Sequence, residues 1–395
     1  MKKIISMFLS IVMMATLITI TPQKIEAAAI GKVTLSIEKL TIGQGVFGQP
    51  TQVTINSGDT VKSVIDRYMN SNSYNYYYSN TDGWYLTAIV NGDKSRVANI
   101  PNTIANISEQ FSFTYYGDDK LTHVRSYNAP STNKNLGNKD TILGEGDYGE
   151  MSGWVVTVNN KAYFSGKTFN TEDGNPNTDP TVRNLYKAAD KISVKNGDVI
   201  RVMFTVFGYG ADVGIDTFDN TGIRKISLAD KTELLKTVAD VNVKKSYWTV
   251  YPNVKEAYDG AVSLVKNYNP AQATVNNAVN KLKNAIKSPK NPPVGTTKIS
   301  SAKNAKGKKI KVTVSQVSGA TGYQFKYGNN KKLKNKKKKK WKAVSVRKTK
   351  KTYTTKKIKN LTKKKAYVKV RAYKKVNGKY VYGKWTAVKK VTLKK

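Results

Sequence analysis

The segment Ala366-Tyr367-Val368-Lys369-Val370-Arg371-Ala372-Tyr373 decides the fold class of the C-terminal part of the chain. Small or aliphatic residues alternate in it with large or charged ones, the two-residue period of a strand with one buried face. Shorter segments with this period surround it, with turn signals such as Asn377-Gly378 between them. They are residues 309–314, 323–327, 341–346, 380–382 and 387–393. Residues 300–395 are therefore predicted to form a β-sandwich.

A linker precedes this predicted sandwich. Residues 288–299 contain Pro289, Pro292, Pro293 and Gly295, and proline and glycine at this density resist both helix and sheet. We therefore place a domain boundary here, with the C-terminal module directly after it.

Residues 226–287 have the period of amphipathic helices instead. Asp230 followed by Glu233 predicts an N-cap with its capping-box partner at the start of the first helix. Three apolar stripes follow, and Pro270 separates the last two. Their members are Leu234, Leu235, Val238 and Val241, then Val254, Ala257, Tyr258, Ala261, Val262 and Val265, and finally Val275, Ala278, Val279, Leu282 and Ile286. We predict a small three-helix bundle that acts as a spacer.

Residues 30–225 are predicted to be rich in strands. The two-residue period recurs in residues 33–37, 52–55, 155–158 and 199–206. One helix interrupts these strands after a cap at Asp59 or Thr60. Its apolar stripe is Val61, Val64, Ile65 and Tyr68. We predict an α+β head here, and a multidomain, mainly β protein for the whole chain.

Residues 1–29 have the pattern of a secretory signal peptide. Lys2-Lys3 is a charged start, residues 4–20 are an apolar run, and Ala27-Ala28-Ala29 supplies a cleavage site. An uncleaved membrane anchor is the alternative, but the run is shorter than the roughly 20 residues that a bilayer requires. We expect cleavage, no transmembrane segment after it, and a secreted or cell-wall-associated extracellular protein.

Positive charge is concentrated in the C-terminal module. The chain has a net charge of +42, and residues 301–395 hold 35 Lys and Arg with no Asp or Glu. The rest of the chain has 33 basic and 26 acidic residues, or +7. Cysteine is absent, so no disulfide stabilises the fold; in an exported protein this favours a Gram-positive bacterial surface over an animal secreted domain.

The C-terminal module resembles a fibronectin type III domain of the kind found in exported clostridial proteins. The matching residues are 317–323, Leu361 with residues 367–373, and residues 382–385, in about a quarter of the chain. The resemblance implies that Leu361 and Tyr367 lie at the corner where a tyrosine hydroxyl secures a strand connection. Val314 stands where the family usually has a core Trp, which implies altered packing there.

The head resembles the transcobalamin-like C-terminal domain family. The motifs that carry the resemblance are Gly58-Asp59-Thr60-Val61, residues 85–92, 152–159 and 196–200, in the order of the family. Two insertions, residues 93–140 and 165–187, exceed the compact family pattern. The name-giving relative lays this domain over a corrinoid ring, so the resemblance implies cobalamin capture as one function.

The helical segment is similar to small three-helix spacers of the FIVAR type. The similarity rests on Gln272-Ala273-Thr274-Val275, which matches the start of their third helix. It implies that residues 226–287 hold the head and the C-terminal module apart.

Aromatic residues in the head are candidates for a ligand site. The candidates on or near the matched motifs are Trp84, Tyr85, Tyr76, Tyr77, Trp154 and Asn159. Exposed rings stack on a corrinoid or on a sugar, and we expect at least one ring of the tyrosine run to face water. A core position on its strand is the alternative for Trp154. We predict a small-molecule or carbohydrate ligand, with cobalamin as the one cofactor that the resemblance suggests.

The sequence offers few combinations of residues that could act in catalysis. His123 is the single histidine and cysteine is absent, so a Cys-His pair is excluded and a Ser-His-acid triad depends on His123 alone. Glu145, Asp147 and Glu150 stand among glycines, which indicates a loop rather than the facing carboxylates of a glycosidase. We predict that the chain is not an enzyme.

One segment has oxygen ligands at a spacing that calcium uses. Its members are Asp173, Asn175, Asn177 and Asp179, around Gly174. Pro176 interrupts the pattern and no Glu closes it, so we predict a solvated polar loop and assign no metal.

A lysine run between two predicted strands is the sharpest feature of the C-terminal module. Its charged members are Lys331, Lys332, Lys334, Lys336, Lys337, Lys338, Lys339 and Lys340. A polybasic hairpin attracts anionic polymers through charge density and counterion release. Lysine reads base edges poorly, so no specific nucleic-acid partner is predicted. A merely soluble lysine-rich surface is the alternative.

These features together predict a non-enzymatic secreted or cell-surface protein for binding or adhesion. Its head binds a ligand, and its basic module is retained on anionic cell-wall polymers or acidic glycans. A corrinoid-capture protein and a purely structural surface protein are the two other functions that the sequence allows.

Overall fold

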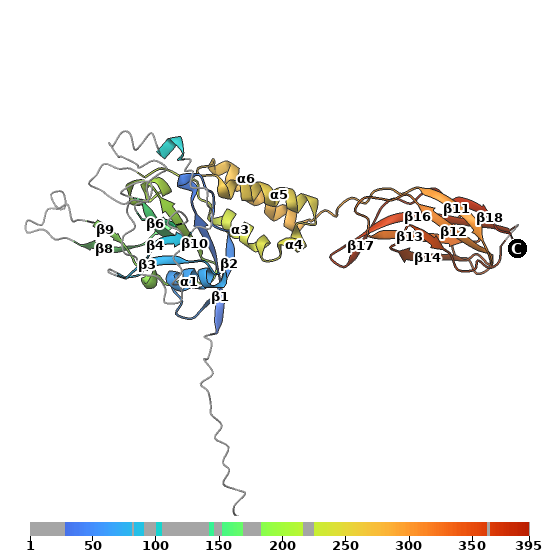
Figure 1. Cartoon of the computed structure of the whole chain (residues 1–395), viewed down its shortest axis with the longest axis horizontal. Helices are drawn as coiled ribbons and strands as arrows, with labels where there is room; N and C mark the ends of the chain where they lie inside the picture. The colour runs from blue at the N-terminus through green and yellow to red at the C-terminus, as the bar shows by residue number, and fades with distance from the viewer. Residues whose placement is uncertain are drawn as a thin grey trace, which may run out of the picture.

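The computed structural model describes residues 28–80, 83–90, 100–104, 142–145, 152–168, 183–215, 225–361 and 364–394. They form an α+β head, a layer of helices against it and a separate pair of β-sheets (Figure 1). The chain is thus multidomain and mainly β, as predicted. In this described part no helix is both long and apolar enough to cross a membrane. The predicted signal peptide lies almost wholly outside the described residues.

The head is built on a five-stranded sheet in the order β2-β1-β10-β6-β7. Its strands are β1 (Ala29–Glu38), β2 (Thr51–Asn56), β6 (Gly153–Val158), β7 (Lys161–Ala162) and β10 (Val199–Thr205). The central strands β1 and β10 are parallel, and every other pair in this sheet is antiparallel. All of β10 is buried, as expected for a strand covered on both faces. The four strands predicted for the head are confirmed.

Helix α1 (Val61–Ser71) covers one face of this sheet. Its N-cap is Thr60, whose hydroxyl and backbone exchange hydrogen bonds with Ser63 in a capping box. The predicted apolar stripe of α1 is buried against Val33, Leu35 and Ile37. Smaller elements complete the head: β3 (Tyr76–Ser79), β4 (Tyr85–Val90), β5 (Ile142–Gly144), β8 (Phe164–Thr168), β9 (Arg183–Tyr186), η1 (Leu40–Ile42), η3 (Ala189–Lys191) and η4 (Gly208–Val213).

Helix α3 (Thr232–Asn242) packs on the opposite face of the sheet and belongs to a group of four helices. The others are α4 (Lys245–Trp248), α5 (Pro252–Lys266) and α6 (Gln272–Lys287), of which α4 was not predicted. Helices α3, α5 and α6 share one apolar core, and Val199 of β10 belongs to it. Asn242 also donates to the carbonyl of Pro50, and Gln52 to Asp240. The three predicted helices form, and α3 also packs on the sheet of the head.

The predicted capping box of α3 is also wrong. The carboxylate of Asp230 accepts a hydrogen bond from the backbone of Thr232, but the N-cap position falls on Lys231. Glu233 pairs instead with Lys283 of α6, with 2.7 Å between Oε2 and Nζ. Glu233, which the sequence pattern assigned to a local capping box, therefore joins α3 to α6 instead.

Charged side chains are buried between the sheet and the helices. Glu38 and Arg201 form a bidentate pair, with nitrogen-to-oxygen distances of 2.9 and 2.7 Å. Burial alone raises the pKa of Glu38, but the charge and hydrogen bonds of Arg201 outweigh it, so the pKa lies below its usual value. Burial lowers the pKa of Lys231 to about 8. The Lys231 ammonium donates to main-chain carbonyls at the C-terminal end of α5, where the helix dipole favours a cation.

The C-terminal module is a β-sandwich, as predicted. One sheet contains β11 (Ile299–Ala305), β12 (Lys309–Val314) and β15 (Thr352–Thr354). The other contains β13 (Gly322–Gly328), β14 (Ala343–Lys348), β16 (Lys365–Val376), β17 (Lys379–Tyr382) and β18 (Lys389–Thr392). Their inner faces share one core, in which Val314 is buried together with Phe325 and Val370.

The expected tyrosine corner is not where the resemblance implies. Ala366 and Val368 of β16 are buried in the sandwich core, so the alternation of the strand puts Tyr367 on the outer face. Other tyrosine hydroxyls secure the connections: that of Tyr323 accepts from the backbone of Val317, at 3.0 Å. The predicted Asn377-Gly378 turn is confirmed, and the Asn377 side chain donates to the carbonyl of Tyr247 in α4 and to the hydroxyl of Tyr251.

Candidate polyanion-binding site

The lysine run forms an ordered hairpin between β13 and β14. We define the lysine hairpin as residues 331–340, in which every lysine is exposed. Leu333 in its middle is buried and fixes the loop to the module. The backbones of Lys336 and Trp341 exchange two hydrogen bonds, of 3.2 and 3.1 Å. The positive charges therefore project from a fixed main chain.

Two buried asparagines at the start of the loop hold it in shape. Asn330 donates to the carbonyl of Lys334 and accepts from its amide, at 2.9 and 3.2 Å. Asn329 donates to the carbonyl of Lys340 at 3.0 Å and accepts from the amide of Lys342 at 2.9 Å. Both ends of the loop are thus tied to side chains that the module itself buries.

The side chains of two hairpin lysines pack over the ring of Trp341. The ammonium nitrogens of Lys336 and Lys339 lie 5.9 and 5.5 Å from the centre of its ring. This is the range of a cation–π attraction, which is worth about 0.5–1 kcal/mol at an exposed site. The ring offsets part of the repulsion between the two ammonium groups.

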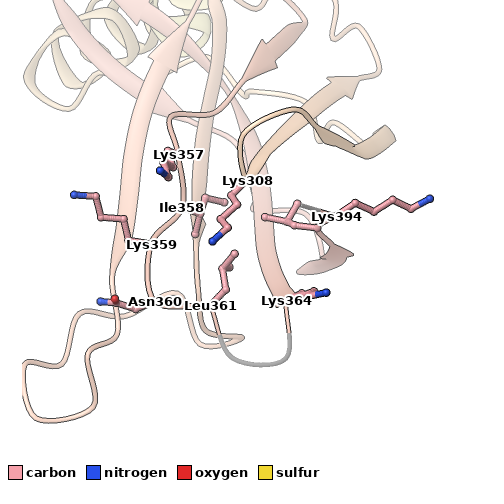
Figure 2. Close-up of a pocket in the computed structure, with 9 residues that line it drawn as sticks. Lys308, Lys357, Ile358, Lys359, Asn360, Leu361, Lys364 and Lys394 are labelled. Atoms are coloured by element: carbon pink, nitrogen blue, oxygen red, sulfur yellow. The ribbon is translucent and has the colours of Figure 1, made fainter.

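A second group of lysines surrounds a cavity at the same end of the module (Figure 2). The cavity has a volume of about 490 Å³, and Ile358, Leu361 and Leu393 contribute apolar surface to it. We define the lysine pocket by its charged lining residues, which are Lys308, Lys357, Lys359, Lys364 and Lys394. Figure 2 shows Lys359 and Lys394 extending to opposite sides of it.

Backbone hydrogen bonds build the walls of the lysine pocket. The amide of Ile358 donates to the carbonyl of Lys308 at 3.0 Å, and that of Leu393 to the carbonyl of Lys364 at 2.8 Å. Lys308 has a φ of +60°, so the turn between β11 and β12 is held in the left-handed region. Two connections of the sandwich, β11–β12 and β15–β16, and the segment after β18 therefore meet around one cavity.

Asn329 joins the lysine hairpin to the lysine pocket. Besides its contacts in the hairpin, its side-chain amide donates to the carbonyls of Lys359 and Asn360, at 3.3 and 2.9 Å. We call the hairpin and the pocket together the distal basic surface. No residue from 301 to 395 is acidic, so no carboxylate of the module neutralises it. Such a surface creates a positive potential that concentrates anions near it.

Three of the aromatic candidates in the head are buried. Trp84 is 2% exposed, Tyr76 5% and Tyr77 6%. Trp84 packs against the rings of Tyr76 and Tyr78, with centroids 6.3 and 5.9 Å apart. These three rings belong to the core of the head and are not available for stacking on a ligand. Tyr78 of the same run remains half-buried.

The other three candidates do not form one site either. Trp154 is half-buried, donates to the carbonyl of Leu143 at 3.1 Å and packs against Phe204, which agrees with the core alternative. Asn159 is exposed, but its side chain binds Asp198 and the backbone of Val199 and so supports a turn. Tyr85 is half-buried on β4.

The head does contain a cavity that sequence reasoning missed. It has a volume of about 480 Å³ and lies between β2, α1 and the segment before β2. Polar residues dominate its lining: Gln49, Thr51, Gln52, Thr54, Arg67, Tyr68, Ser71, Asn72 and Tyr74. Burial raises the pKa of Tyr68 to about 12, so this hydroxyl stays protonated at neutral pH. The residues come from distant positions, and no local motif marks them.

The remaining candidates are for the most part not described. His123, Asp147, Glu150 and the calcium-like segment around Gly174 lie outside the described residues. Glu145 is exposed in the turn after β5. Among the described residues no three His, Cys, Asp or Glu side chains are grouped in a way that could hold a metal ion.

Comparisons with known proteins identify no family for this chain. No family model matches the chain, and no curated protein matches its sequence. Among solved structures the chain is similar to "a Fn3-like protein from Clostridium thermocellum", with 21% identity and a TM-score of 0.19 over 26% of this chain and 97% of that one. The resemblances to the transcobalamin-like and FIVAR families stay predictions.

Proposed function

We propose that this chain is a non-enzymatic binding protein of the bacterial exterior that is retained on anionic polymers by the distal basic surface. One observation carries the proposal: Asn329 holds eight hairpin lysines beside five pocket lysines in a module without acidic residues. A solvated lysine-rich surface needs neither fixed loops nor a cavity. A partner with many negative charges relieves the repulsion among these lysines and releases its own counterions.

The two parts of the surface have different roles in this proposal. The exposed hairpin lysines follow a polymer backbone and neutralise successive phosphate or carboxylate groups. The lysine pocket takes a single anionic group, with its apolar wall against the adjoining polymer carbon atoms. Lysine suits both roles, because its flexible point charge needs no fixed ligand geometry.

The position of the distal basic surface fits retention at one end of the molecule. The turn between β16 and β17 contacts Tyr247 of α4 and Tyr251, whereas β16 begins at the lysine pocket. The twelve residues of this strand separate the surface from the helices (Figure 1). A chain retained by the distal basic surface therefore keeps its head directed away from the polymer.

For the head we propose a small polar or carbohydrate ligand in the cavity beside Arg67, Tyr68 and Tyr74. The polar lining of this cavity supports the choice. Corrinoid capture has less support, because Trp84, Tyr76 and Tyr77 are buried and leave no ring faces for a large flat ligand.

Retention is tested with two variants of the full chain that lose the same charge. One replaces Lys336 to Lys340 by Gln, and the control replaces five exposed lysines elsewhere in the module: Lys348, Lys350, Lys351, Lys375 and Lys379. Binding to immobilised inorganic polyphosphate is measured at about 0.15 M salt, where exposed charges interact only over about 8 Å. We expect at least a tenfold loss for the hairpin variant and less than a threefold loss for the control. Equal losses would mean that net charge alone retains the chain.

A further inference from the structure

The outer face of the larger sheet of the sandwich carries an alternating stack of cations and aromatic rings. The guanidinium carbon of Arg371 lies 3.7 Å from the ring centre of Tyr382 and 4.5 Å from that of Trp385. That of Arg347 lies 4.2 Å from the ring centre of Tyr380. We call this stack the cation–aromatic ladder; its members in order are Tyr380, Arg347, Tyr382, Arg371, Trp385 and Lys369.

Hydrogen bonds fix the two arginines of the ladder. Nε of Arg347 donates to the hydroxyl of Tyr382 at 2.6 Å, and Nε of Arg371 donates to the side-chain oxygen of Gln324 at 2.8 Å. Gln324 in turn donates to Ser345 at 2.9 Å. One hydrogen bond from Nε therefore fixes the orientation of each guanidinium group. Its terminal amino groups meet no carboxylate of the module, because the module has none.

The distribution of arginine in the module distinguishes this face, although the net charge does not. The module contains 33 lysines and only two arginines, Arg347 and Arg371, and both stand in the ladder. Lysine thus supplies the bulk charge, and arginine occurs only where a ring stacks on it. A planar guanidinium stacks on aromatic rings and binds carboxylates with two parallel hydrogen bonds, which an ammonium does not do.

Positive charges are crowded on this outer face of the sheet. Burial and then the charges of Lys326 and Arg371 lower the pKa of Lys369. Burial, opposed by Tyr382 and reinforced by Arg347, lowers the pKa of Arg371. Four cations repel one another on a face without an acidic residue, and a bound anion would reduce this repulsion.

We propose that the cation–aromatic ladder binds a carboxylate-bearing polysaccharide, at a site distinct from the distal basic surface. The arginine forks hold sugar carboxylates. The exposed edge of the ladder, where Tyr380 is 43% exposed, packs against the apolar face of a sugar ring. A polyphosphate offers the charges but no rings, whereas a uronic-acid polymer offers both at every unit.

The test uses polygalacturonate and inorganic polyphosphate as probes on the full chain. The double variant Arg347→Lys with Arg371→Lys keeps the charge and removes the planar forks, and Tyr380→Ala removes the exposed ring at the end of the ladder. We expect each to weaken polygalacturonate binding at least fivefold and to change polyphosphate binding less than twofold. The Lys336-to-Lys340 Gln variant is expected to lose more affinity for polyphosphate than for polygalacturonate.

Several outcomes would overturn the proposal. Wild type that fails to bind polygalacturonate at about 0.15 M salt, above the general attraction of anions to the basic module, overturns it directly. So do ladder variants that melt at a lower temperature but bind polygalacturonate as tightly as wild type, because the ladder then serves stability alone. Equal losses for both probes show a general loss of fold or charge and reject a separate carboxylate site. Tyr380→Ala leaves both arginines in place, so it decides the matter if the double variant does not fold.

Discussion

The side-chain amide of Asn329 lies 2.9 Å from the main-chain oxygen of Asn360 and donates a hydrogen bond to it. Asn329 belongs to the loop with the lysine hairpin, and Asn360 lines the lysine pocket. One buried side chain therefore holds two groups of like charges next to each other. The density of positive charge at this end of the module is a property of the fold as well as of composition.

Replacing Asn329 by Ala is expected to weaken polyanion binding without removing a charge. The change leaves the carbonyls of Lys340 and Asn360 without a donor and releases the hairpin from the pocket. We expect a three- to tenfold loss of affinity for polyphosphate and a loss of about 1–3 kcal/mol in unfolding free energy. Binding and urea unfolding of the full chain are the measurements.

The matched control is Asn377→Ala, which also removes a bonded asparagine side chain from the module. It is expected to leave polyphosphate binding unchanged, because Asn377 lies at the opposite end of β16. Unchanged affinity in Asn329→Ala would show that the hairpin acts independently of the pocket.

The buried pair of Glu38 and Arg201 is expected to respond differently to single and double replacement. Glu38→Gln leaves the Arg201 charge buried without its partner, which costs about 3–5 kcal/mol in unfolding free energy. Replacing both residues by Met removes both buried charges, and we expect it to recover at least about 2 kcal/mol of that loss. Urea unfolding of the three chains gives the values. A double variant that is less stable than Glu38→Gln would contradict this description of the layer between sheet and helices.

Asp212 makes stability depend on pH in the acid-to-neutral range. Burial raises its pKa from 3.8 to about 7, against the hydrogen bonds that it accepts from Thr205, Val206 and Phe207. A raised pKa in the folded state means a contribution that is fully present below pH 3.8 and is lost as the pH rises through about 7.

Asp212→Asn mimics the protonated carboxyl and removes this dependence. We expect the variant to match wild type only near pH 3, where the carboxyl is protonated in both states, and to be more stable by roughly 4 kcal/mol at pH 8. Melting temperatures of both chains across this range test the prediction. Curves that stay parallel from pH 4.5 to pH 8 would show that Asp212 is ionised throughout.

Most of the secondary structure follows from local pattern. The alternation of residues 366–373 and the helical stripe that starts at Val61 each specify which face is buried, and β16 and α1 form as predicted. The cap of α3 does not follow from local pattern, because Glu233 finds a stronger partner in Lys283, fifty residues away in the chain. Local rules describe a helix end only where no tertiary contact competes.

The candidate sites show the same division. The hairpin lysines lie within ten successive residues, so their exposure in a loop was predictable. The burial of Trp84 was not, because its backbone and the segment at Ala189 and Asp190 bond across more than a hundred residues. The ladder was missed because Arg347, Arg371 and Tyr382 come from three different strands. The restriction of arginine to two positions of the module was its one sequence signal.

The salt dependence of polyphosphate binding tests the central claim most directly. If at least five lysines of the distal basic surface neutralise phosphates, the logarithm of the association constant falls against the logarithm of salt concentration with a slope of about −4 or steeper. The Lys336-to-Lys340 Gln variant is then expected to have a slope flatter by about 3. A wild-type slope shallower than about −1, or the same slope in both chains, would contradict retention by the distal basic surface.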